Sequence, residues 1–85
     1  MYNLMKKEYI PIDCGLHDEL ELRAVRKQKI RLIYFNEKNE IEMNECVITD
    51  VYSKDKTEYL KTDFGLTIRL DNLLEMDNII FNKSC

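Results

Sequence analysis

The sequence predicts a mainly β fold, with one N-terminal α-helix followed by a strongly bent, five-stranded antiparallel sheet that forms a partial barrel. Apolar residues with helical spacing occur near the N-terminus, from about residue 15 to residue 25. From Ile30 onward, apolar residues instead alternate with a period of two in short runs. Short polar turns separate these runs, as they do in antiparallel sheets. All 85 residues therefore form a single domain, in which residues 1–8 are expected to be a flexible tail.

The stretch from Tyr9 to Leu22 begins as extended chain and continues as the helix. Pro11 fixes its own φ and disfavours a helical conformation for the residue before it, so the chain enters the helix extended. Asp13 is expected to be the N-cap, because its carboxylate can accept hydrogen bonds from N–H groups of the first turn. Asp18 and Glu19 follow near the positive end of the helix dipole, where acidic side chains are stabilising.

The expected helix has two different faces. Leu16, Leu20 and Ala24 follow one another at intervals of four residues and form an apolar stripe, which we expect to face the core. Asp18 and Glu21 are three residues apart and share a face away from that stripe. The helix therefore presents an acidic surface to a partner.

Runs with period-two alternation predict strands over residues 30–35, 40–52, 57–63 and 66–70, followed by a segment over residues 73–76 and a closing apolar stretch over residues 79–81. The first strand is apolar on both faces, as expected in a partly closed barrel. The second strand is long, and its alternation breaks at Glu45-Cys46-Val47, which predicts a β-bulge or a strong bend. Polar turns rich in Asn, Asp and Lys join consecutive strands.

The sequence shows no pattern that identifies catalytic or metal chemistry. Cys14, Cys46 and Cys85 lack CxxC spacing and make a poor zinc set with the single histidine. They are expected to be buried or unreactive thiols in a reducing cytoplasm. Cys14 and His17 could approach each other at a helix start, but the sequence identifies no orienting group or oxyanion hole for them. We therefore expect that the protein is not an enzyme and that it binds no cofactor and no metal.

The charge and hydropathy of the chain indicate a soluble binding protein. A formal net charge of −3 argues against unaided binding of a nucleic-acid backbone. No apolar run reaches the length that a bilayer requires, and the N-terminus lacks the apolar region of a secretory signal. We therefore expect a cytoplasmic protein that does not contact a membrane. By elimination its function is binding, and the acidic helix face is its most distinctive surface.

Several segments of the sequence resemble the Rof family of bacterial Rho-binding antiterminators. The most specific is Tyr9-x-Pro11-Ile12-Asp13-Cys14-x-x-His17-Asp18-x-Leu20-Glu21-Leu22, which is similar to the opening of those proteins. Glu58-Tyr59-Leu60 and Arg69-Leu70-Asp71 also resemble them, so that the similarity extends over about residues 9–76. The resemblance implies an Sm-like fold, which agrees with the order of elements derived above.

The resemblance also implies a partner and an activity. The partner is the hexameric transcription termination factor Rho, and the activity is antitermination by obstruction of the primary RNA site on the N-terminal OB-type domain of Rho. The residues expected to bind Rho are Tyr9, Asp13, His17, Asp18, Glu19 and Glu21 at the helix, with Lys54 in the turn over residues 53–56 as a second contact. The free protein is expected to be a monomer that does not bind nucleic acid directly.

A basic run over residues 23–31 (RAVRKQKIR) leaves an alternative open. These bases can complement the negative C-terminal end of the helix dipole. They can also form a nucleic-acid patch, in which case the chain would be an RNA-binding Sm-like protein.

Overall fold

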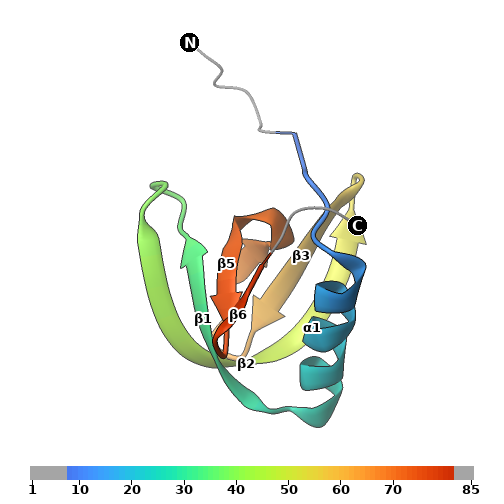
Figure 1. The fold of residues 1–85 in the computed structure, drawn as a ribbon, viewed down its shortest axis with the longest axis vertical. Coiled ribbons are helices and arrows are strands. Elements are labelled where there is room, and N and C mark those ends of the chain that lie inside the picture. Colours follow the sequence, from blue (N-terminus) through green and yellow to red (C-terminus); the bar gives the residue numbers. More distant parts are fainter. Residues whose placement is uncertain (1–7, 82–85) are drawn as a thin grey trace.

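The computed structural model describes residues 8–81 of the chain. The flexible tail predicted for residues 1–8 therefore lies outside the described residues, apart from Glu8. Within residues 8–81, one α-helix precedes six strands, and a short 3₁₀ helix links the fourth strand to the fifth (Figure 1). The elements in chain order are α1 (Cys14–Arg26), β1 (Lys29–Phe35), β2 (Ile41–Lys54), β3 (Thr57–Thr62), β4 (Thr67–Arg69), η1 (Leu70–Asn72), β5 (Leu73–Met76) and β6 (Ile79–Ile80).

The strands form one antiparallel sheet in the order β4-β3-β2-β1-β5-β6. The prediction of a mainly β fold with an N-terminal helix is confirmed. The sheet differs from the expected strongly bent, five-stranded partial barrel, because it has six strands and is not closed or strongly curled. In this sheet β4 pairs with β3 and β6 pairs with β5, so these two strands form its edges.

The additional strand arises from a tight turn after β5. Asp77 and Asn78 both have positive φ, 48° and 73°, which Asp and Asn tolerate better than most residues. The turn places Ile79 opposite Met76, so that the chain returns antiparallel to β5. Because β6 contains only two residues, its alternation is too short to identify a strand from the sequence.

Strand β2 belongs to both halves of the sheet. Residues 41–47 pair with β1, and the part of β2 from Ile48 onward pairs with β3. The pairing with β3 shifts register between Ile48 and Asp50, so the predicted irregularity is present a few residues later than expected. Figure 1 shows β2 curving along its length between the two halves.

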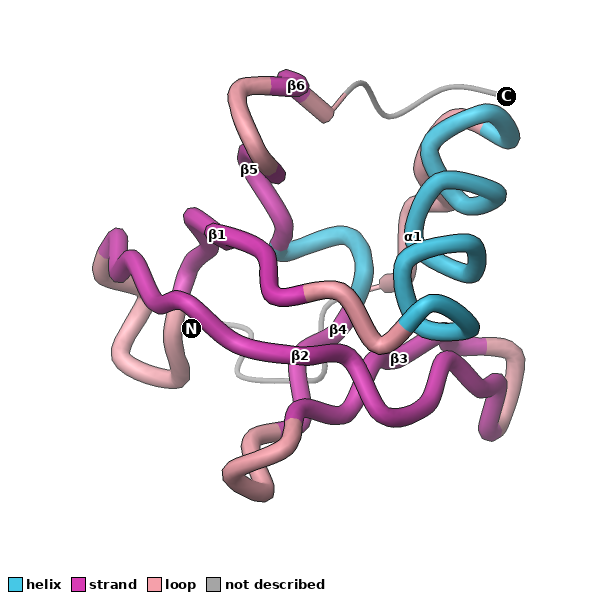
Figure 2. The backbone as a smooth tube through the Cα atoms, turned by 90° about the horizontal axis from the view of Figure 1, so that it is seen from below, coloured by secondary structure: helices cyan, strands magenta, loops and turns pink. Residues whose placement is uncertain are grey.

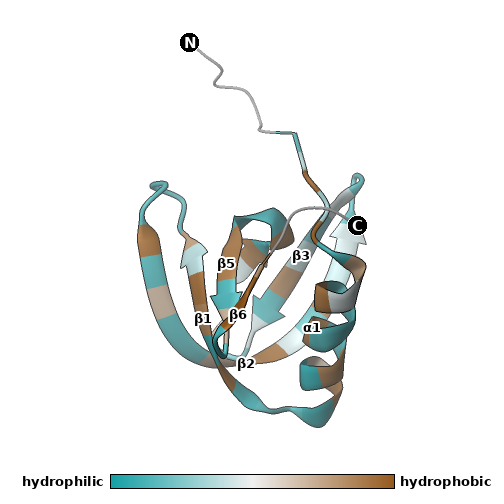
Figure 3. Cartoon of the chain, viewed as in Figure 1, coloured by the Kyte–Doolittle hydropathy of each residue, from teal (hydrophilic) through white to brown (hydrophobic). Residues whose placement is uncertain are grey.

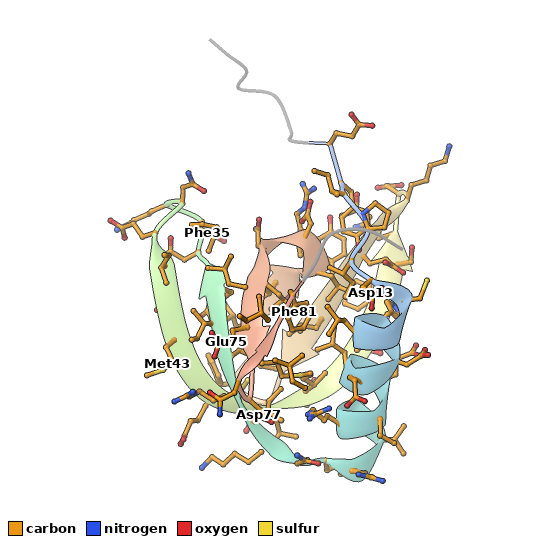
Figure 4. All side chains as sticks on the ribbon, in the orientation of Figure 1. Asp13, Phe35, Met43, Glu75, Asp77 and Phe81 are labelled. Atoms are coloured by element: carbon orange, nitrogen blue, oxygen red, sulfur yellow. The ribbon has the colours of Figure 1, made fainter. Side chains whose placement is uncertain are left out.

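The apparent break at Glu45-Cys46-Val47 has a different cause. Pairing with β1 is regular through this stretch, and Cys46 and Ile48 are both buried. Ile41 and Met43 lie on the outer face, where they are 66% and 57% exposed, and Figure 4 shows Met43 directed away from the core. The alternation changes phase because these two apolar residues face solvent, while the backbone remains regular.

The core lies between α1 and the sheet. Leu16 and Leu20 are the buried residues of α1, and Ala24 packs against the core with partial exposure, as the apolar stripe predicts. Figure 2 shows α1 along one side of the sheet, where it packs on β2. In Figure 3, apolar and polar residues alternate along the strands, in agreement with the alternate burial of β1.

Helix α1 begins after Asp13 and ends at Arg26, close to the predicted bounds. Asp13 occupies the N-cap position, but its side chain makes no cap hydrogen bond; its carbonyl oxygen accepts two helix N–H groups. The prediction of a side-chain cap is therefore wrong, although the position is right. The first turn holds no acidic residue, so Asp18 and Glu19 lie beyond it. No helix within residues 8–81 is both long and apolar enough to cross a bilayer.

The cysteines differ in part from the predicted free thiols. Cys14 is disulfide-bonded, which corrects that prediction for this residue. Cys46 is a free thiol in the core and is 2% exposed. Burial, with a smaller contribution from the Asp63 carboxylate, raises the pKa of the Cys46 thiol to about 11. Cys85 lies outside the described residues.

We expect the folded protein to lose stability in alkaline solution as Cys46 ionises. Its thiol has an ordinary pKa of 9.0, which applies to the unfolded chain, and a pKa of about 11 in the fold. Below pH 9 both states keep the proton, so the full stability is present there. It declines as the pH rises from 9 to about 11, because in this range the unfolded chain releases the proton and the folded protein keeps it. Urea denaturation between pH 8 and pH 11.5 should show a loss of about 2 kcal/mol from this thiol.

A Cys46→Val variant, which has no titrating group at this position, is the control. Tyr9 and Tyr34 also have pKa values raised by burial, so part of the alkaline decline should remain in the variant. The decline should nevertheless be smaller than in the parent protein. Identical pH profiles for the two proteins would contradict the prediction.

Candidate protein-binding site

The extended segment before α1 is fixed to the rest of the protein at several points, two of which are Ile10 and Ile12. The backbone N–H of Ile10 donates a hydrogen bond to Oδ2 of Asp71 at 3.2 Å. Ile12 is 3% exposed and belongs to the core. Pro11, between them, has no N–H that would need a partner, and its fixed φ suits an extended chain. The segment therefore enters α1 in a defined direction.

Asp71, in η1, is the buried acid that holds this segment. It is 0% exposed, and it accepts hydrogen bonds from Arg69, with 3.0 Å from Nε to Oδ1 and 2.8 Å from Nη2 to Oδ2. The Arg69 guanidinium also lies over the ring of Tyr9, with 5.8 Å between Cζ and the ring centroid. A buried carboxylate requires such a paired cation. The pair therefore joins β4, η1 and the segment before α1.

Tyr9 connects the same segment to β3 and to the helix. Its hydroxyl donates a hydrogen bond to Oε1 of Glu58 at 2.7 Å, and Oε2 of Glu58 lies 3.2 Å from Nε2 of His17. Burial and the adjacent Glu58 carboxylate raise the pKa of Tyr9 well above its ordinary value, so its hydroxyl stays protonated at neutral pH. These contacts hold the start of α1 against a strand that is distant in the sequence.

Beside these contacts, one surface of α1 and β3 carries a group of acidic side chains. We call Asp18, Glu21 and Glu58, together with His17, the acidic cluster. Asp18 and Glu21 are exposed, whereas Glu58 is partly buried. Nδ1 of His17 lies 3.7 Å from Oε1 of Glu21. The side-chain ligand atoms of His17, Asp18 and Glu21 all lie within 4.8 Å of one another. The predicted shared face of Asp18 and Glu21 is confirmed.

Glu19 and Asp13 are predicted site residues that are not members of the acidic cluster. Glu19 forms an ion pair with Arg23, which also donates to Oδ2 of Asp77 at 3.4 Å. These contacts direct Glu19 toward the turn between β5 and β6. Asp13 lies at the N-terminal end of α1 (Figure 4). Its carboxylate lies close to Gly15, because Oδ2 would be only 3.2 Å from a Cβ atom added to that glycine. The structure therefore brings Asp18 and Glu21 together without Glu19.

Glu58 belongs to the acidic cluster, although the sequence did not identify it as a site residue. It lies opposite Ser53 in the β2–β3 hairpin, and Lys54 is exposed at the end of β2 in the same hairpin. The predicted second contact, Lys54, is thus on the hairpin whose Glu58 contacts His17. Spacing along the chain could not connect Glu58 with α1. The one available signal was its place in Glu58-Tyr59-Leu60, which resembles the Rof family.

A concavity of about 310 Å³ borders the acidic cluster. It is lined by residues of the segment before α1, of α1 itself and of β3, namely Pro11, Ile12, Cys14, His17, Asp18 and Glu58. A larger cleft of about 530 Å³ lies between the β1–β2 hairpin and β4, but none of the predicted site residues lines it. The smaller concavity is therefore favoured as part of a site, because the predicted site residues His17 and Asp18 line it.

The basic run over residues 23–31 is partly engaged within the protein. Arg23 forms ion pairs with neighbouring carboxylates, and Nη2 of Arg31 donates a hydrogen bond to Oδ1 of Asn78 at 2.8 Å. Arg23 and Arg26 lie in the last turn of α1, where they complement the helix dipole. Part of this run therefore serves the helix end and contacts within the protein, whereas Arg26, Lys27 and Lys29 are exposed.

The pairing of Cys14 with His17 as nucleophile and base is not supported. Cys14 is disulfide-bonded, and His17 lies between two carboxylates.

A scan against protein-family models and a search of curated proteins found no match for this chain. Its function is therefore inferred from the chemistry of the acidic cluster and from the resemblance of the segments named above.

Proposed function

We propose that this protein binds the transcription termination factor Rho through the acidic cluster and prevents Rho-dependent termination, as the resemblance to the Rof family implies. The observation that carries the proposal is the exposure of Asp18 and Glu21 on a helix whose start is fixed by contacts to β3 and η1. Carboxylates that are positioned before binding lose little conformational freedom when a partner arrives. Such a surface suits a partner with basic groups.

The RNA-binding site of Rho has the required charge. A site that holds RNA phosphates must be electropositive, so carboxylates can occupy the positions of phosphates. One charge-assisted hydrogen bond contributes about 1.5–3 kcal/mol, and an exposed ion pair contributes about 0.2–1 kcal/mol. Several contacts are therefore needed. We propose that Asp18 and Glu21 contact the primary RNA site on the N-terminal domain of Rho, and that the remaining contacts come from Tyr9, Asp13, His17, Glu19 and Lys54.

The proposal includes an Sm-like fold, which the same resemblance implies. Two features support it: the helix before the antiparallel sheet, and the curved strand β2, which pairs with both β1 and β3. It also includes a cytoplasmic location, because the proposed partner acts on RNA during bacterial transcription. In the proposed mode one monomer obstructs the RNA site and contacts no nucleic acid itself.

Competition for Rho tests this function. The tag-free protein is added to Rho that carries a fluorescent pyrimidine-rich single-stranded RNA, and anisotropy reports the bound RNA. We expect the RNA to be released as the protein concentration rises, and longer transcripts to appear in a termination assay. Undisturbed RNA binding and termination at large excess of the protein would contradict the proposal. Direct RNA binding that weakens steeply with salt would instead support the basic-patch alternative.

A further inference from the structure

His17 differs from an ordinary exposed histidine because each of its ring nitrogens lies near a carboxylate. Nε2 is 3.2 Å from Oε2 of Glu58 on β3, and Nδ1 is 3.7 Å from Oε1 of Glu21 on its own helix. Asp18, the next residue along α1, brings a second exposed carboxylate, which has an oxygen within 4.8 Å of the ligand atoms of His17 and Glu21. The imidazole therefore has one nitrogen near β3 and the other near a carboxylate of its own helix.

The contact with β3 fixes the orientation of the ring. Glu58 accepts a hydrogen bond from the Tyr9 hydroxyl at 2.7 Å through Oε1, and its Oε2 lies 3.2 Å from Nε2 of His17 as an ion-pair contact. A histidine that donates one N–H to a carboxylate presents the lone pair of its other nitrogen, and metal-binding histidines in proteins are held in this way. When Nε2 carries the ring proton on the side of Glu58, the lone pair belongs to Nδ1, which lies 3.7 Å from Oε1 of Glu21.

We propose that His17, Asp18 and Glu21 form a binding site for a divalent transition-metal ion of the Zn²⁺ class. The ligands would be Nδ1 of His17 and one carboxylate oxygen from each acid. A mixed set of imidazole and carboxylates suits Zn²⁺, at bond lengths of about 2.0–2.2 Å. Asp18 and Glu21 are exposed, so their side chains can close from the present separation onto an ion.

The surroundings supply the rest of such a site. Glu58 and Tyr9 are positioning residues that act through His17. His17 and Asp18 also help to line the concavity of about 310 Å³, together with Glu58. In the sequence, the three cysteines have poor spacing for a zinc site with this histidine, whereas the fold places carboxylates beside it. The inference goes beyond the proposed function, although the two share Asp18 and Glu21.

Titration of the tag-free protein with Zn²⁺, followed by calorimetry, tests the site, and the visible absorption of bound Co²⁺ reports its ligands. We expect one ion per chain. His17→Ala should weaken binding by about 100-fold or more, and Glu58→Gln, which keeps the size of the side chain, by about 10–100-fold. Glu37→Gln with Glu40→Gln, which removes two exposed acids on the β1–β2 hairpin, should leave the affinity unchanged.

Two results would overturn the inference. One is the absence of saturable Zn²⁺ binding, and the other is Zn²⁺ binding that His17→Ala leaves intact. Equal binding of Ca²⁺ that also survives His17→Ala would show a diffuse acidic surface and would likewise overturn it. Thermal melts verify that each variant is folded, and Glu58→Gln tests the site without truncating a ligand. Rho takes no part in these measurements, so their failure is distinct from failure of the proposed function.

Discussion

Replacement of both exposed helix acids, by Asp18→Lys and Glu21→Lys together, is expected to abolish binding to Rho while leaving the fold intact. The two side chains face away from the core, so their replacement removes no buried contact. It places two ammonium groups where the proposed partner is electropositive, and like charges across an interface cost several kcal/mol. We expect a loss of more than about 100-fold in affinity for Rho, measured by anisotropy competition at two salt concentrations.

The matched control is Glu37→Lys with Glu40→Lys, which makes the same change in net charge on the β1–β2 hairpin. Both residues are exposed and lie apart from α1. This variant should retain binding to Rho within about threefold, because long-range charge is screened at physiological salt. Equal loss in the two double variants would show that net charge, rather than the helix face, decides binding. Unchanged binding of the helix variant would remove α1 from the proposed interface.

Substitution of the buried acid, Asp71→Ala, is expected to cost about 3 kcal/mol of folding free energy. The change removes the acceptor of the Ile10 N–H and leaves Arg69 without the carboxylate that it contacts in two places. Breaking a buried ion pair by removal of one partner costs about 3–5 kcal/mol, and the partial exposure of Arg69 places the effect at the lower end. Urea denaturation measures the loss, which is a large fraction of the stability of so small a domain.

Asp63→Ala is the control for this prediction. Asp63 is exposed, and its Oδ1 accepts one hydrogen bond from the backbone of Val47 at 3.2 Å. Its removal should cost about 1 kcal/mol or less. A loss in Asp71→Ala no larger than in Asp63→Ala would contradict the role assigned to Asp71. The same experiment would then show that Ile12 and the contacts of Tyr9 suffice to hold the segment before α1.

Local patterns in the sequence predicted most of the elements but not how they assemble. The helix stripe of Leu16 and Leu20 and the polar turns were read correctly, because each depends on neighbours in the chain. The strand count and the open sheet depend on pairings between distant strands, which alternation does not encode. The bulge was predicted a few residues too early because Ile41 and Met43 are apolar but exposed. Alternation alone cannot distinguish an apolar side chain that faces solvent from a strand that changes which face it buries.

The candidate site was predicted only where it lies within one element. The spacing of Asp18 and Glu21 placed them on one helix face, and the structure agrees. The same reasoning included Glu19, which an ion pair with Arg23 draws toward the other end of the helix. Glu58 was missed as a site residue, because its contact with His17 depends on how β3 lies against α1.

Strand β2 supplies the backbone partners for β1 along its first part and for β3 along its second. When β2 detaches, each half of the sheet loses its neighbour at the same moment, so neither half can persist as a separate folded unit. The slowest-exchanging amides on either side of the register shift should therefore exchange with deuterium through one common global opening. A chain in which one strand pairs with both halves of the sheet has no stable half-folded form. Its transition between folded and unfolded states should therefore proceed in a single step.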